Sequence, residues 1–215
     1  MTWFTALAVV AMSLAVWLVA LPRVRVADPD APRFGALVSR RSTMWVGATA
    51  AAVSGVLWLV PAAHHWLWVP YLAVGVPLVA VDVLTTFLPK QLNHLGGLLM
   101  LAGLVPLGLA DWRAAAGAVV GGAAALAFFY LAWRVAATLG FGDVRLAALI
   151  GAVAGQSGVG AWTSALLAGT LLGALHGIAH ALWARRSAGR PKHFPFGPAL
   201  WLGPVVAAVP HLNGG

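Results

Sequence analysis

Two aspartates stand where a charged side chain is costly. Asp82 lies inside the apolar stretch 79–89, and Asp143 opens a second apolar run. An ionisable group in a hydrocarbon layer is expensive, so its default interpretation is functional. Two carboxylates held together do not both ionise readily, which lets one act as a base on a water molecule and the other as an acid toward a carbonyl. The residue types alone leave hydrolysis and proton or ion transport equally open.

The composition indicates the kind of chain that holds these carboxylates. Of its 215 residues, 61% are hydrophobic and 8% are charged, whereas a soluble domain carries about a quarter charged residues. An ordinary soluble globule, a disordered protein and a nucleic-acid-binding protein are therefore excluded. The chain contains no Cys and no Glu, which excludes disulfides, thiolate metal sites and a zinc protease of the HExxH type.

Apolar runs of spanning length predict an all-α polytopic membrane helix bundle in the lipid bilayer, with about eight transmembrane helices. We expect one membrane-embedded domain over 1–215, with a loop at 22–43 and a core at about 67–212. The expected spans are 3–21, 44–60, 67–87, 95–110, 114–134, 144–160, 161–183 and 197–212. Small residues recur four apart at Gly117 and Gly121 and at Gly151 and Gly155, which predicts close helix packing inside the bundle.

The basic residues predict the orientation. When the eight spans alternate in direction, 12 of the 13 Lys and Arg residues fall on one face, and Arg113 falls on the other. By the positive-inside rule the basic face is cytoplasmic, so both termini lie outside a plasma (inner) membrane. Asp82 then lies about 10 Å above the cytoplasmic end of its span, and Asp143 lies at the cytoplasmic start of another. Both carboxylates are predicted to meet near the cytoplasm.

The segment around Asp143 resembles a known signature. Residues 140–146 read Gly-Phe-Gly-Asp-Val-Arg-Leu. They resemble the GxGD motif of intramembrane aspartic proteases, and specifically the GxGDxKL form of type IV prepilin peptidases. Gly140 and Gly142 match the motif's glycines, and Arg145 replaces its usual Lys with the charge conserved.

Two further segments resemble the same family, in the same order. The first, 81–89, is similar to its first catalytic block, an Asp followed by Thr and then by Pro near the helix end. The second, 194–200, is similar to the Pro-Phe-Gly-Pro segment that opens the last span. The matching residues are Asp82, Thr85 and Pro89 in the first segment and Pro195, Gly197 and Pro198 in the second.

The resemblance implies that Asp82 and Asp143 are a catalytic pair. Members of the family remove short basic leaders from prepilins and pseudopilins on the cytoplasmic side, which implies such a protein as the partner. Bifunctional members have a longer first loop with paired CxxC zinc motifs and also N-methylate the new terminus. The short 22–43 loop and the absence of Cys imply a protease-only form with no metal and no cofactor. The sequence names neither the pilin nor the oligomeric state.

Other chemistries compete for parts of the chain. A membrane transporter that uses Asp82 and Asp143 as a relay is the main alternative function. Structural pairing of these aspartates with Arg134 or Arg145 is another alternative. The segment 155–158 resembles the serine motif of rhomboid proteases. Its Ser157 lies about 20 Å along the helix axis from His176, so we interpret the segment as a turn.

Histidines could serve either serine or metal chemistry. His64 or His65 could approach Ser157 from outside, although nothing in the sequence requires either. His176 and His180 are four residues apart, and we interpret them as a packed or interfacial pair rather than as metal ligands. The remaining acids, Asp28, Asp30 and Asp111, are predicted to be solvated loop charges.

Overall fold

The computed structural model describes residues 2–26, 31–135, 140–185 and 195–209, with the backbone alone described at 184 and 185. Every regular element among these residues is a helix, which confirms the all-α expectation. Asp28 and Asp30 lie outside the described residues, as do Arg186, Arg190 and Lys192.

Eight α-helices follow one another along the described chain. They are α1 (Thr2–Ala15), α2 (Arg40–Val53), α3 (His65–Thr85), α4 (Lys90–Ala110), α5 (Trp112–Val135), α6 (Phe141–Gly155), α7 (Val159–Arg185) and α8 (Gly197–Ala208). A π-helical turn, Val16–Ala20, and a 3-10 turn, Leu21–Arg23, extend α1. The loop expected at 22–43 contains a 3-10 turn at Phe34–Leu37.

Five helical segments are long and apolar enough to cross a membrane: Thr2–Arg23, Ala62–Thr85, Lys90–Ala110, Trp112–Val135 and Val159–Trp183. The chain is therefore a membrane protein. Helices α2, α6 and α8 have 14, 15 and 12 residues, fewer than the roughly 20 that a full crossing needs. A count of eight complete spans and the placement of the termini outside remain predictions.

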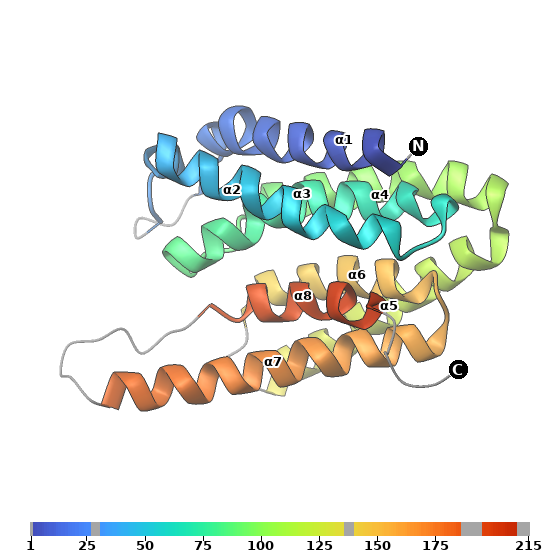
Figure 1. Ribbon diagram of the computed structural model, residues 1–215. Coiled ribbons are helices and arrows are strands. Elements are labelled where there is room, and N and C mark those ends of the chain that lie inside the picture. Colours follow the sequence, from blue (N-terminus) through green and yellow to red (C-terminus); the bar gives the residue numbers. More distant parts are fainter. Residues whose placement is uncertain (1, 27–30, 136–139, 186–194, 210–215) are drawn as a thin grey trace.

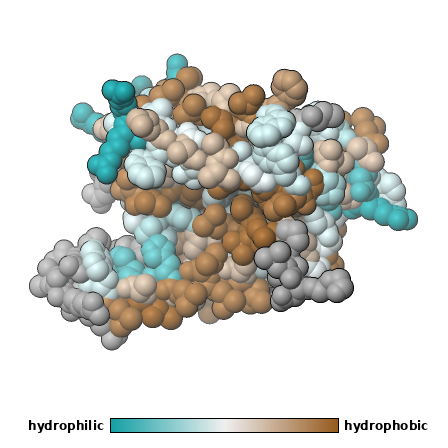
Figure 2. All heavy atoms as spheres, in the orientation of Figure 1, coloured by the Kyte–Doolittle hydropathy of each residue, from teal (hydrophilic) through white to brown (hydrophobic). Residues whose placement is uncertain are grey.

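Successive helices alternate in direction (Figure 1). As a result α1 begins and α8 ends at one end of the bundle, while α3 ends and α4, α6 and α8 begin at the other. We call the second end the basic end, because the described Lys and Arg residues other than Arg113 fall at helix ends or loops there. Hydrophobic side chains cover the surface along α7, and the most hydrophilic ones gather toward the ends of the helices (Figure 2).

Helix α3 lies at the centre. Within its apolar stretch, 78% of the residues are buried, whereas the corresponding share is 17% for α7 at the periphery. Helices α1, α2, α4, α6 and α8 all pack against α3. The Tyr71 hydroxyl of α3 donates to the backbone carbonyl of Trp201 in α8 over 2.5 Å, and the two rings stack. Asp82 is thus carried by the innermost helix.

Glycines bring the last four helices into backbone contact. A Cβ at Gly117 would lie 2.5 Å from the carbonyl oxygen of Gly155, and one at Gly121 would lie 2.5 Å from that of Gly151. In the same way, Gly169 of α7 closely approaches the backbone of Leu200 in α8. The predicted packing of small residues within the bundle is confirmed, and it brings α6 against α5 and α8 against α7.

The orientation can be tested by labelling, because the chain has no Cys of its own. We expect Gly35→Cys and Lys90→Cys to react with a membrane-impermeant maleimide only from the cytoplasmic side, because both lie at the basic end. Ser157→Cys, beyond the far end of α6, should react only from outside. Wild-type protein is the unlabelled control. Labelling of Lys90→Cys from outside would contradict the orientation.

Candidate active site

Asp82 lies one turn before the end of α3, and the residues after it stop the helix. Thr86 has a left-handed backbone, with φ of 57°, and its N–H donates to the carbonyl of Asp82. The Thr85 hydroxyl donates to the carbonyl of Val81 over 2.7 Å and accepts the amide two residues later. Pro89 then precedes the first turn of α4. Thr85 and Pro89 therefore shape the turn after Asp82 rather than extending toward its carboxylate.

Asp143 lies in the first turn of α6. Its Oδ2 accepts the N–H of Gly140 over 3.2 Å, which caps the helix and suits a carboxylate at the positive end of the helix dipole. The side chain is buried, with 8% exposed. Its other oxygen, Oδ1, is buried and has no hydrogen-bond partner among the described residues. A buried acceptor is nearly always paired with protein or water, so Oδ1 is the natural place for a water molecule.

The segment 194–200 contacts the segment 81–89 through a buried hydrogen bond. The N–H of Gly197, the first residue of α8, donates to Oδ2 of Asp82 over 3.0 Å, although the residues are 115 positions apart. A Cβ at Gly197 would lie 2.7 Å from the same oxygen, so glycine is needed for this approach. Pro198 occupies the first turn of α8, where a missing N–H costs nothing, and half-buried Pro195 precedes the helix.

Leu88 completes the junction of the three segments. A Cβ at Gly142 would lie 2.6 Å from the Leu88 Cβ, and one at Gly197 would lie 3.4 Å from its Cδ1. Leu88 therefore lies between the start of α6 and the start of α8. The segments that carry Asp82, Asp143 and Gly197 meet at the basic end of the bundle.

The two carboxylates form a buried like-charged pair. Asp82 is 3% exposed and lies close enough to Asp143 for their charges to interact. Neither forms an ion pair with another described residue. The Arg145 guanidinium lies 4.5 Å from the centre of the Phe141 ring on its own helix. Pairing of the aspartates with Arg134 or Arg145, the structural alternative, is therefore absent among the described residues.

Sequence reasoning missed Asn93 of α4. Its side chain is 3% exposed, and neither its Nδ2 nor its Oδ1 has a hydrogen-bond partner among the described residues. Gly96, one turn later on the same face, closely approaches Val74 of α3 and Leu149 of α6. Asn93 thus faces the α3–α6 interface, nearer than Gly96 to the basic end. A polar amide at the start of an apolar helix was the only sequence signal.

A serine and a histidine meet at the opposite end of α6. The Ser157 hydroxyl lies 3.4 Å from Nδ1 of His64, and Asp111 interacts electrostatically with this histidine. The possible approach of His64 is thus realised, although the distance exceeds the usual 2.6–3.2 Å of a nucleophile and its base. Asp111 also caps α5 by accepting the amides of Arg113 and Ala114. This group lies about 20 Å along α6 from Asp143.

The described residues contain no group of three or more His, Cys, Asp or Glu side chains that could hold a metal ion. The ring of His180 lies 5.5 Å from that of Trp183 on the same helix.

In comparisons with protein-family models, curated proteins and solved structures, nothing matches the chain.

The contact at Leu88 generates a prediction. We expect Gly142→Ala to displace the 86–89 turn, because the new methyl would lie 2.6 Å from the Leu88 Cβ. Overpacking of this kind costs about 1–3 kcal/mol, measurable as a lower unfolding temperature in detergent. The matched control is Gly97→Ala, where the nearest atom outside its own helix lies at 3.9 Å. Equal stability of the two variants would contradict the packing described.

Proposed function

We propose that the protein is a prepilin leader peptidase, an intramembrane aspartic endopeptidase. In this proposal it removes the basic leader of type IV-like prepilins or pseudopilins at the cytoplasmic face of the inner membrane. The observation that carries the proposal is the meeting of three distant segments at two buried carboxylates, through Gly197 and Leu88. They are the same three segments that resemble this family in sequence.

The carboxylates can divide the work of peptide hydrolysis. The ionised one removes a proton from a water molecule whose oxygen attacks the peptide carbonyl carbon. The protonated one gives its proton to the carbonyl oxygen, which forms a tetrahedral intermediate with two hydroxyls. This intermediate collapses when the first aspartate passes the water's proton to the departing nitrogen and the second takes a proton back from one hydroxyl, so both aspartates return to their starting states. Hydrogen bonds from Gly140 and Gly197 hold one oxygen of each aspartate, which fixes the orientation of both carboxylates. The unpartnered Oδ1 of Asp143 is the natural acceptor for the attacking water.

The alternative, a transporter with the same pair as a relay, needs a polar path to the other face. Residues 72–81 of α3, which lead from Asp82 toward that face, are all apolar, and all but Ala80 are buried. Between Asp82 and Tyr71, a relay has no proton-carrying side chain on this helix. The location of the pair near one end favours chemistry at that face.

The pair generates the main prediction. We expect Asp82→Asn and Asp143→Asn each to lower leader cleavage about 10⁴-fold or more, because each carboxylate is needed in a different protonation state. The double variant should be no worse than either single one, since groups that act as a unit are not additive. Asp82→Glu and Asp143→Glu should lose about a hundredfold, because the carboxylate moves by roughly 1 Å. Co-expression with a prepilin and a gel shift of its leader measures this.

Controls separate the pair from other acids and from the serine. Asp111→Asn and Ser157→Ala should cleave normally, because both residues lie at the far end of α6. Membrane levels of each variant are compared by immunoblot. Normal processing by either Asp→Asn variant would overturn the proposal of an aspartic peptidase. Loss of cleavage in Ser157→Ala alone would favour serine chemistry.

The proposed chemistry needs no metal. We expect leader cleavage by purified, reconstituted protein to continue in a strong chelator, and the new terminus to carry no methyl group by mass spectrometry. Wild-type protein without chelator is the reference. If cleavage is lost in chelator and restored by added zinc, His176 and His180 act as metal ligands, and the metal-free proposal is wrong.

A further inference from the structure

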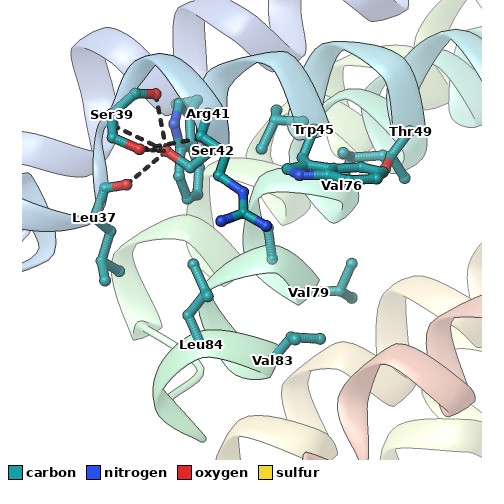
Figure 3. A pocket seen from close by; sticks show the side chains of 13 residues that line it. Leu37, Ser39, Arg41, Ser42, Trp45, Thr49, Val76, Val79, Val83 and Leu84 are labelled. Carbon is teal, nitrogen blue, oxygen red and sulfur yellow. Dashed lines mark hydrogen bonds between the residues drawn. The ribbon is translucent and has the colours of Figure 1, made fainter.

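A large cavity lies between α2 and α3, away from the carboxylate pair. Its volume is about 620 Å³, within the range of small-molecule sites, and α1 contributes Trp17 to its wall. Figure 3 shows Arg41 extending from α2 into this space, above Val79 and Leu84 of α3. Nothing in the proposed function uses this cavity.

The cavity is polar at one end and mostly apolar along the rest, where Thr49 of α2 also lines it. The polar residues Ser39, Arg41 and Ser42 come from the first turn of α2, at the basic end. The two serines bond to each other, and Ser42 also donates to the carbonyl of Leu37. The Arg41 guanidinium, by contrast, makes no hydrogen bond to any described residue. The apolar wall is formed by Trp45, Val46, Val76, Val79, Ala80, Val83 and Leu84.

Trp17 of the α1 extension forms part of the inner wall of the same cavity. It lies in the π-helical turn Val16–Ala20, and its side chain is completely buried. The indole ring therefore adds apolar surface behind the valines.

The cavity does not face the carboxylates. Its α3 residues, Val76, Val79, Ala80, Val83 and Leu84, recur at the spacing of one helix face. At 100° per residue, Asp82 points about 130° away from the centre of that face, toward α8. A peptide held for cleavage at Asp82 would therefore lie on another side of α3, and Arg41 would repel a basic leader.

We propose that this cavity binds one anionic phospholipid from the leaflet at the basic end. The lipid phosphate pairs with Arg41, and an acyl chain follows the valines of α2 and α3. The dimensions agree: Arg41 and Thr49, at the two ends of the α2 wall, are about 12 Å apart along the helix, close to the depth of one leaflet's hydrocarbon. The site does not depend on the peptidase activity.

Lipid retention tests the proposal. The full-length protein is reconstituted in bilayers of phosphatidylcholine and phosphatidylglycerol at 7:3, extracted gently and analysed by native mass spectrometry. We expect wild-type protein to retain one phosphatidylglycerol in preference to phosphatidylcholine. Arg41→Gln should lower that occupancy about fivefold, the usual effect of one basic side chain at an anionic membrane surface.

Arg40→Gln is the matched control, because Arg40 is the exposed neighbour on the same helix but does not line the cavity. It should retain lipid as wild type does. Equal retention of both lipids by wild type, or unchanged retention in Arg41→Gln, would overturn the proposal. An equal loss in Arg40→Gln and Arg41→Gln would also overturn it, since it would show general surface attraction. Arg41 is exposed, so its substitution leaves the packing of the bundle intact.

Discussion

The hydrogen bond from the Gly197 amide to the Asp82 carboxylate connects the central helix of the bundle to the start of its last helix, which the Tyr71–Trp201 bond also holds further along. It is buried, and it uses one of the amides that a helix start leaves without an internal partner. Both groups would be costly to bury alone, and each satisfies the other. The position of α8 and the orientation of Asp82 therefore depend on each other.

The approach of Asp143 to Asp82 depends on small residues elsewhere in the bundle. Asp143 reaches the same place because α6 lies in backbone contact with α5, through Gly117, Gly121, Gly151 and Gly155. In a lipid environment, helix association relies on close packing rather than on the hydrophobic effect, so such glycines carry much of the stability. A bulkier residue in this interface would shift the start of α6 and with it the carboxylate, without touching the site directly.

Periodicity, charge and three local motifs predicted the helical membrane architecture and singled out Asp82 and Asp143. They could not predict the contacts that join the segments. The position of Leu88 between Gly142 and Gly197 depends on how three helices cross, which no local pattern records. The approach of His64 to Ser157 and the unpaired amide of Asn93 arise in the same way. The cavity at Arg41 was also not predicted, because in the sequence this residue indicated only which face of the bundle is basic.

The starts of α6 and α8 and the two carboxylates depend on each other. With 15 and 12 residues, α6 and α8 are about 22 and 18 Å long, shorter than the roughly 30 Å hydrocarbon core, whereas α7 has 27 residues. Both short helices begin beside Leu88, inside the bundle, where amides without an intrahelical acceptor need partners. Asp143 and Asp82 are those partners. The carboxylates stabilise the helix starts, and the helix starts fix the orientation of the carboxylates.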